Sequence, residues 1–468
     1  MHWLDPLDAA MITADVVSSP LNIGAVLILS PPPDSKPGYV DELHQGSLAG
    51  ATFNPRLRRH PHRGIGTGGG WVWEEADEID LHRHCLRRTL PPGSGDIALW
   101  QLISTLHAGP LDRSRPMWMS CLIDGFDDRR FALYIKLHHT VMDGVSGLQT
   151  LVGALSPDPH RRSMPAFYAD PCTGHDDATT HRHRRLPDPL ALVRSSIRHT
   201  ASSVALAERV ATGMAAGALA GLFGGTTLTP FAAPYVRFNE RLGHERAVIA
   251  ASWPRRRFQA FTTKSGVTAN DVVTAVIAGA LREWLSDHDE LPQRSLVAIC
   301  PISVHGRELN RSELHGNMFG AWLCPLGTDL PDPAERLDLI HRSMLVGKQH
   351  VKARGAAASL ILLAPGIAST VLPPMLPLRP RIHVGYNLPI SHVPGPRTEM
   401  YWNGAHVEQI YPISAVYDGQ GLNVTTCSYA DRIGFGYVAD REILPDIGEL
   451  VPLTEQALTE LERATGLV

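Results

Sequence analysis

The stretch that decides the fold is Phe131-Ala-Leu-Tyr-Ile-Lys-Leu-His138-His139-Thr-Val-Met-Asp143-Gly144. Residues 131–139 alternate as a β-strand does, so His139 shares the apolar face of Phe131 while His138 points to the other face. On the apolar face, desolvation favours a neutral imidazole that accepts a proton near pH 7. We expect His138 to point outward or into a polar second layer. The pattern predicts His139 as a general base that deprotonates a substrate hydroxyl directly; a satisfied core histidine is the alternative.

A short turn and a helix follow the strand. Asp143 and Gly144 end the turn, and Val145, Leu148 and Val152 continue with the spacing of an amphipathic helix. Asp143 therefore has two interpretations, as the cap of this helix or as a residue that orients the site.

The sequence fits three other kinds of site poorly: a metal site, a serine-hydrolase elbow and a phosphate-binding loop. A two-histidine, one-carboxylate metal site needs both imidazoles on one side, and neighbouring strand positions do not provide that, so we expect no metal. The segment Gly144-Val-Ser146-Gly147-Leu148 lacks the last glycine of a serine-hydrolase elbow. The run Gly66-Thr-Gly-Gly-Gly70 lacks the Gly-Lys-Ser/Thr of a phosphate-binding loop.

Composition narrows the class of protein. The chain has 468 residues, a formal net charge of -4 and 44% hydrophobic residues, which indicate two or three globular domains. The low net charge argues against a nucleic-acid partner. Its six cysteines are far apart and form no Cys-x-x-Cys pair, and the start shows no basic segment followed by an apolar one. We therefore expect reduced thiols and a cytoplasmic location.

Charge is unevenly distributed along the chain. Residues 156–189 are rich in Pro, Asp, His and Arg and are expected to form a linker. Residues 210–236 and 355–378 contain no charged side chain but are broken by Gly and Pro. Simple spanning helices are therefore not expected. The two interpretations are core helices with loops, or a contact with a lipid surface.

Two elements of the second half have clear local signals. Thr268 and Asp271 form a capping pattern before a 3.6-residue apolar period that extends to Leu285, which predicts a helix. Residues 422–429 and 433–438 flank Ala430-Asp431-Arg432 and predict a β-hairpin.

These motifs resemble a known family. The segment His138-His139-Thr-Val-Met-Asp143-Gly144 is similar to the His-His-x-x-x-Asp-Gly motif of CoA-dependent acyltransferases. Further matches point to the bacterial wax ester synthase/acyl-CoA:diacylglycerol acyltransferase family. They are Leu4-Asp-Pro-Leu7-Asp8-Ala9, Pro110-Leu111-Asp112-Arg113-Ser-Arg115-Pro116-Met117-Trp118, Asn270-Asp271 and Val393-Pro394-Gly395-Pro396.

The resemblance implies a fold and a division of the chain. The fold is α/β, with two similar chloramphenicol-acetyltransferase-like domains that have mixed sheets and meet along a catalytic channel. We expect an N-terminal domain at 1–155, a linker and apolar connection at 156–236, and a C-terminal domain at 237–468.

The resemblance also implies roles for residues. His139 is the general base, with His138 in a second layer, and Asp143 and Gly144 shape the loop, Asp143 through an ion pair. Asn270 is a candidate donor to the oxyanion, or simply a polar residue in the first turn of a helix.

A second group is expected on the substrate-binding side: Asp271, His392, Pro394 and Gly395. Pro394 and Gly395 have the alternative of a fixed turn. His392 replaces the asparagine usual in the family, so an imidazole stands where the family has an amide that both donates and accepts.

The implied reaction is acyl transfer from acyl-CoA to diacylglycerol, with no cofactor beyond acyl-CoA as co-substrate. A fatty alcohol is the alternative acceptor, which would give a wax ester. Condensation on carrier-bound acyl groups, and lipid binding or lipid-droplet coating with little turnover, are alternatives from other classes. We expect peripheral association with the inner membrane or lipid droplets.

Overall fold

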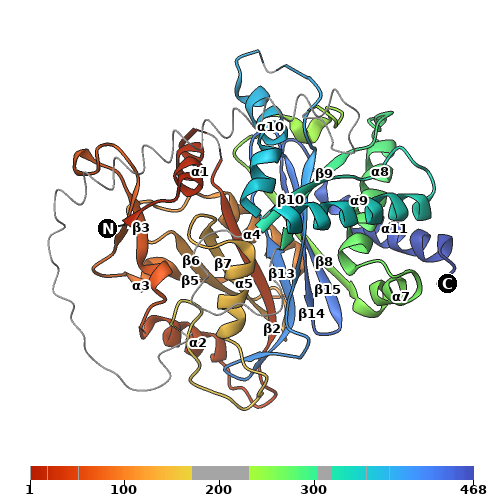
Figure 1. The fold of residues 1–468 in the computed structure, drawn as a ribbon. Helices are drawn as coiled ribbons and strands as arrows, with labels where there is room; N and C mark the ends of the chain where they lie inside the picture. Colours follow the sequence, from red (N-terminus) through yellow and green to blue (C-terminus); the bar gives the residue numbers. More distant parts are fainter. Residues whose placement is uncertain are drawn as a thin grey trace.

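The computed structural model describes residues 2–17, 19–50, 52–170, 231–303, 319–354, 356–378 and 380–468. Two halves lie side by side, each built on a six-stranded sheet (Figure 1). Both sheets are mixed, since β5 and β6 pair in parallel in one and β11 and β14 pair in parallel in the other, while the remaining neighbours include antiparallel pairs. The predicted α/β class with two mixed-sheet units is confirmed.

The first sheet has the order β12-β13-β2-β7-β6-β5. Its strands are β2 (Asn22–Ser30), β5 (Cys85–Thr89), β6 (Trp118–Asp124), β7 (Phe131–His138), β12 (Tyr401–Trp402) and β13 (Ala405–Ile413). A small sheet beside it has the order β1-β4-β3 and consists of β1 (His2–Trp3), β3 (Arg59–His62) and β4 (Val72–Glu75).

The second sheet has the order β10-β9-β11-β14-β15-β8. Its strands are β8 (Arg246–Pro254), β9 (Val297–Ser303), β10 (Phe319–Pro325), β11 (Leu388–Pro394), β14 (Leu422–Tyr429) and β15 (Arg432–Asp440). The predicted hairpin at 422–438 is confirmed, because β14 and β15 pair antiparallel from Leu422 opposite Ala439 to Tyr429 opposite Arg432.

Helices cover both sheets. In the first half they are α1 (Pro6–Val17), α2 (Tyr39–Leu48), α3 (Leu81–His84), α4 (Gly95–Ala108) and α5 (Gly144–Gly153). In the second half they are α7 (Arg255–Ser265), α8 (Ala269–Asp287), α9 (Pro333–Arg354), α10 (Ala356–Met375) and α11 (Leu450–Ala464). Short 3₁₀ turns are η1 (Pro55–Arg58), η2 (Ile65–Thr67), η3 (Arg237–Asn239) and η5 (Ile447–Glu449).

The predicted helix after Thr268 is confirmed as α8. The Thr268 hydroxyl accepts a hydrogen bond from the Asp271 N–H at 3.4 Å, and the Asp271 carboxylate accepts one from the Thr268 N–H at 2.8 Å. This reciprocal cap satisfies two backbone donors that the first turn of a helix leaves free. The helix is then buried almost all round, between α9, α11 and the second sheet.

The sheets do not follow the division at 155 and 237. Strand β13 comes from the C-terminal half of the sequence but pairs with β2 in the first sheet, from Ile413 opposite Gly24 to His406 opposite Ser30. This pairing satisfies the backbone groups that β2 would otherwise expose at a sheet edge. Residues 156–170 also belong to the first half, through the bridges Ser156–Tyr401 and Phe53–Ala169. The rest of the predicted linker, and residues 210–230, lie outside the described residues.

A shared core joins the two halves. Leu99 and Ile103 of α4 pack in one hydrophobic cluster with Val248 of β8 and Val438 of β15. In the second uncharged stretch, residues 356–375 form α10, which contains three prolines. None of the helices in the described ranges has both the length and the apolar character to cross a membrane.

Candidate functional site

His139 is the first residue after β7, at the point where the strand leaves the sheet. Its N–H donates a hydrogen bond of 2.9 Å to the Leu21 carbonyl, just before β2. The Val141 N–H then donates to the His138 carbonyl at 2.9 Å, which closes a tight turn. These two hydrogen bonds fix the backbone on both sides of His139. The residue itself is half-buried.

His138 is held in a polar second layer, as one of its two predicted placements has it. The side chain is only 2% exposed, and its Nδ1 lies 2.7 Å from the Thr140 hydroxyl. Its Nε2 lies 3.5 Å from Asp15 Oδ1.

Asp15 of α1 connects this layer to the backbone of His139. Its Oδ2 accepts a hydrogen bond of 2.5 Å from Arg113, and its Oδ1 accepts one of 2.8 Å from the Leu21 N–H. Leu21 is the residue whose carbonyl receives the His139 N–H. Burial opposes ionisation of Asp15, but the contacts with His138, Leu21 and Arg113 outweigh it and hold its pKa below the ordinary value.

The surroundings of His139 keep its imidazole neutral. Burial lowers its pKa, while the Asp143 carboxylate acts in the opposite direction and more weakly. The Nδ1 atom is buried and has no hydrogen-bond partner among the described residues. A neutral imidazole at the end of a strand is the state that a general base needs.

Asp143 and Gly144 form the start of α5. Asp143 Oδ1 accepts a hydrogen bond of 2.7 Å from the Ser146 N–H, so within the described residues this carboxylate is a helix cap, not the ion-pair member that the resemblance implies. A Cβ atom at Gly144 would meet nothing within 4 Å, so the first turn of α5 leaves open space beside it.

Asn270 and Asp271 occupy the first turn of α8 in different environments. Asn270 is half-buried, and its neighbour Ala269 lines a cavity described below. Asp271 is fully buried, and its Oδ2 accepts hydrogen bonds of 2.8 Å from both Thr268 and His341. Asp271 therefore stabilises the helix start from inside the protein, and its predicted contact with substrate has no support from its position.

His392 lies in β11 with both ring nitrogens occupied. Nδ1 is 2.8 Å from the Thr426 hydroxyl and Nε2 is 3.1 Å from the Ser428 hydroxyl. Burial, and to a smaller extent the nearby Arg255 guanidinium, lower its pKa to about 4. The neutral imidazole thus finds hydrogen-bond partners across the β11–β14 pair where the family usually has an asparagine.

Pro394 and Gly395 end β11 against β14. A Cβ atom at Gly395 would lie 2.4 Å from the Ser428 carbonyl oxygen and 3.1 Å from Cys427 Sγ, so only glycine fits here. Cys427 belongs to the same hydrophobic cluster as Val141 and Met142, the residues that follow His139. Through this cluster, the turn after β11 in one half packs toward the histidine turn in the other.

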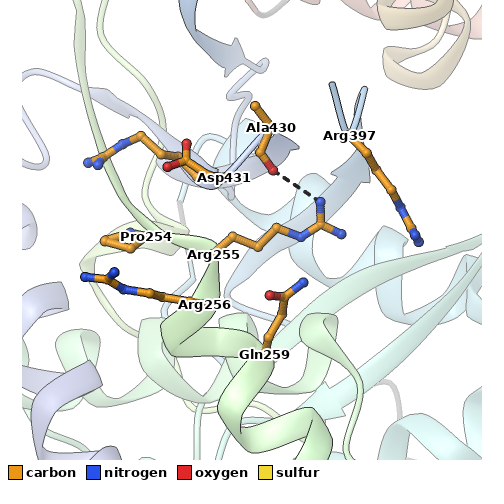
Figure 2. A pocket seen from close by; sticks show the side chains of 8 residues that line it. Pro254, Arg255, Arg256, Gln259, Arg397, Ala430 and Asp431 are labelled. Carbon is orange, nitrogen blue, oxygen red and sulfur yellow. Dashed lines mark hydrogen bonds between the residues drawn. The ribbon is translucent and has the colours of Figure 1, made fainter. Parts of the chain in front are cut away.

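Two neighbouring cavities lie on the second half, beside this turn. The larger one, of about 610 Å³, lies between the start of α7 and the β14–β15 turn (Figure 2). The smaller one, of about 240 Å³, is lined by His392, Pro394, Gly395 and Ala269 among others. Within the described ranges, His, Cys, Asp and Glu side chains form no group of three or more that could hold a metal ion.

Sequence reasoning missed the residues that support the histidines. Arg113 is part of a quoted motif, but its partner Asp15 is 98 positions away, and no local pattern pairs the two. The arginines of the larger cavity come from three separate segments and carry no sequence signal of their own.

Comparisons with known proteins agree with this architecture. The wax ester synthase/diacylglycerol acyltransferase catalytic domain matches residues 4–273, and the C-terminal domain of the same family matches residues 315–462. A Mycobacterium tuberculosis protein named by prediction as a diacylglycerol O-acyltransferase is 37% identical over 468 residues, which cover 99% of this chain and 100% of the relative.

Solved structures extend the comparison. The wax ester synthase/diacylglycerol acyltransferase of Marinobacter aquaeolei VT8 superposes with a TM-score of 0.77 at 29% identity, over 100% of both chains. The first condensation domain of the calcium-dependent antibiotic synthetase shares the fold at a TM-score of 0.57 and 14% identity, over 99% of this chain and 96% of that one.

The fold and the histidine turn thus define a CoA-dependent type of acyltransferase. The chain belongs to the wax ester synthase/diacylglycerol acyltransferase family.

Proposed function

We propose that this protein transfers an acyl group from acyl-CoA to the free hydroxyl of diacylglycerol and so makes triacylglycerol. The observation that carries the proposal is the placement of His139, whose backbone is fixed between β7 and α5 and whose pKa is lowered by burial. Relatives named as diacylglycerol O-acyltransferases over their full length support the choice of acceptor.

His139 acts as the base in a single transfer step. Its Nδ1 is enclosed by protein, so Nε2 is the nitrogen that takes the proton of the acceptor hydroxyl as the oxygen attacks the thioester carbonyl. The C–S bond then breaks, and the same proton passes to the departing CoA thiolate. No acyl-enzyme forms, and acyl-CoA is the only co-substrate. Asn270 is the candidate donor to the oxyanion, at the start of α8.

A wax ester is the second candidate product, because the solved relative from Marinobacter is named for both activities. Thin-layer analysis of products from radiolabelled palmitoyl-CoA, with dioleoylglycerol and hexadecanol offered separately and in competition, tests both. We expect triacylglycerol to be the main product. Wax ester alone would overturn the choice of acceptor, and no ester with either acceptor, with no CoA released, would overturn acyl transfer.

We also propose that the protein touches a lipid surface from the cytoplasmic side. Leu372, Leu376 and Leu378, at and after the end of α10, are 56%, 50% and 93% exposed. Phe231 and Ile382, which are 51% and 43% exposed, each lie two residues before a member of the antiparallel bridge between Ala233 and Val384. Large apolar side chains gathered at one place are typical of surfaces that meet lipid or a partner.

Liposome flotation tests this contact. We expect wild-type protein to float with vesicles, and the double variant Leu376→Glu/Leu378→Glu to remain in the soluble fraction. Ile65→Glu is the matched control, because Ile65 is fully exposed in the first half, away from α10. Wild-type protein that stays entirely in the soluble fraction would refute the contact.

A lipid-binding protein without turnover differs from the enzyme in one measurable way. It would bind lipid droplets equally well as wild type and as His139→Ala, and wild type would release no CoA. The enzyme releases CoA and loses that release when His139 is replaced.

A further inference from the structure

The larger cavity has an unusually basic lining. Four of its residues are arginines, namely Arg255 and Arg256 at the start of α7, Arg397 after β11 and Arg432 at the start of β15. Its acidic residue is Asp431. In Figure 2, Arg255 and Arg397 approach the same space from two different segments, with Gln259 beside them. A pocket with this charge suits an anion rather than an acyl chain.

Three of these four arginines are not paired with a carboxylate of the described residues. Arg257, next in sequence, shows the contrast, because it binds Glu455 and Glu462 at 2.7 and 2.6 Å on the other side of α7. Among the described residues, Arg255, Arg256 and Arg397 form no ion pair, and the hydrogen bond of Arg255 to the Ala430 carbonyl is long, at 3.4 Å. Arg432 is structural, since it donates to Ser252 Oγ and to the Ser252 carbonyl at 2.8 and 2.7 Å.

The basic cavity is continuous with a less polar one. The smaller cavity shares Arg255, Gln259 and Arg397 with it and is also lined by Phe258 and Ile433. Its lining includes the Pro394-Gly395 turn, where Gly395 lies against Cys427. Cys427 belongs to the same hydrophobic cluster as Val141 and Met142, which follow His139. The two adjoining cavities therefore run from four arginines at the surface to the Pro394-Gly395 turn.

We infer that the basic cavity binds the phosphate groups of the nucleotide end of acyl-CoA, and that the smaller cavity receives the pantetheine arm. This rests on the proposed use of acyl-CoA as donor. Guanidinium groups bind phosphate oxygens in a planar, two-pronged geometry, and the N-terminus of the eleven-residue helix α7 adds backbone N–H groups. Phosphate on a lipid headgroup has the same chemistry, but the exposed Leu372, Leu376 and Leu378 lie at the end of α10, which Figure 1 shows away from α7.

The test is the affinity for free CoA, measured by isothermal titration calorimetry on the full chain. We expect Arg255→Gln and Arg397→Gln each to raise the Kd about tenfold, because each removes a charge-assisted contact with phosphate. Arg397→Lys should recover part of the loss, since the charge is kept and the planar fork is lost. Thermal unfolding of each variant verifies that the fold is intact.

Arg294→Gln is the matched control. Arg294 is exposed, forms no ion pair among the described residues, and follows the far end of α8, whose start lines the smaller cavity. Its Kd for CoA should equal that of wild type. Equal Kd values for wild type, Arg255→Gln and Arg397→Gln would overturn the inference.

Two further arms separate the site from the reaction and from lipid. His139→Ala should bind CoA as wild type does, so CoA binding without any acyl transfer by wild type would refute the proposed function and leave the site standing. Vesicles of phosphatidylcholine with phosphatidic acid test the other phosphate source. If Arg255→Gln and Arg397→Gln lower vesicle binding but leave the Kd for CoA unchanged, the cavity serves lipid headgroups and the inference is wrong.

Discussion

The histidine turn and the basic cavity are built in opposite ways. The histidine turn lies at the end of an interior strand, and its charged supports, Asp15 and Arg113, pair with each other. The basic cavity lies at the surface, and three of its arginines form no ion pair among the described residues. Under the proposed function, the difference teaches how one chain serves a neutral acceptor and a highly charged donor: burial keeps the His139 imidazole uncharged, while arginines without ion pairs remain available to an anion.

Replacing Asp15 disturbs the buried support of the histidine turn and should have the largest effect on the rate of acyl transfer. Asp15→Asn removes the negative charge that holds His138 and Arg113 in place, and loosens the Leu21 backbone that fixes His139. We expect kcat to fall about 10- to 100-fold with KM for acyl-CoA unchanged, as for a lost positioning group.

Steady-state kinetics of Asp15→Asn are compared with those of Asp338→Asn. Asp338 is the control because it forms an exposed ion pair with Arg342 on α9. A rise in KM for acyl-CoA at constant kcat would place Asp15 on the donor side instead.

Acid should destabilise the packing of α4 on the first sheet around His107. Burial, reinforced by the charge of Lys136, lowers the pKa of His107 to about 3 from 6.5, and its ring bonds to Tyr134 and to the Ser414 carbonyl of the other half of the sequence. Between pH 6.5 and about 3, His107 is protonated in the unfolded chain and neutral in the folded chain. Stability is therefore full above pH 6.5 and falls as pH decreases.

Urea unfolding at pH 7 and pH 4.5 measures this loss, of which His107 should account for about 2 kcal/mol. The variant His107→Gln should show a smaller difference between the two pH values, and His82→Gln, an exposed histidine of α3, the same difference as wild type. If the pH dependence of stability is unchanged in His107→Gln, then His107 does not cause the loss of stability in acid.

The smallest effect is expected at Asp143. Asparagine also caps helices, so Asp143→Asn keeps α5 but removes the charge that raises the pKa of His139. That pKa should fall further, and the base should stay neutral to lower pH. Relative to the maximum of its pH profile, kcat/KM at pH 5 should rise about two- to fivefold. A shift of the acid limb to higher pH would contradict this electrostatic role.

Local patterns in the sequence predict part of this molecule well. The alternation of residues 131–139, the cap at Thr268 and the turn at 430–432 each concern residues that are close in sequence, and the structure has β7, α8 and the β14–β15 hairpin there. The family resemblance extends these local signals to the two mixed sheets.

The remaining features depend on contacts between distant segments. The pairing of β13 with β2 crosses the expected domain boundary. The turn at Asn403-Gly404 indicates only the hairpin of β12 with β13, and nothing local indicates β2 as the other partner. The contact of Asp15 with His138 and the meeting of Arg255 with Arg397 likewise arise only when α1, α7 and the ends of β7 and β11 come together. Asp271 shows the reverse, because a motif residue expected to bind substrate is buried as a helix cap.

The most direct test of the central claim is a single-turnover measurement on His139→Ala with acyl-CoA and diacylglycerol, alongside its affinity for CoA. The account predicts that the rate of CoA release falls at least about a thousandfold, the effect of removing a general base that acts in the only chemical step, while the Kd for CoA stays that of wild type. A transfer rate within tenfold of wild type would contradict the account, because the base would then be another group.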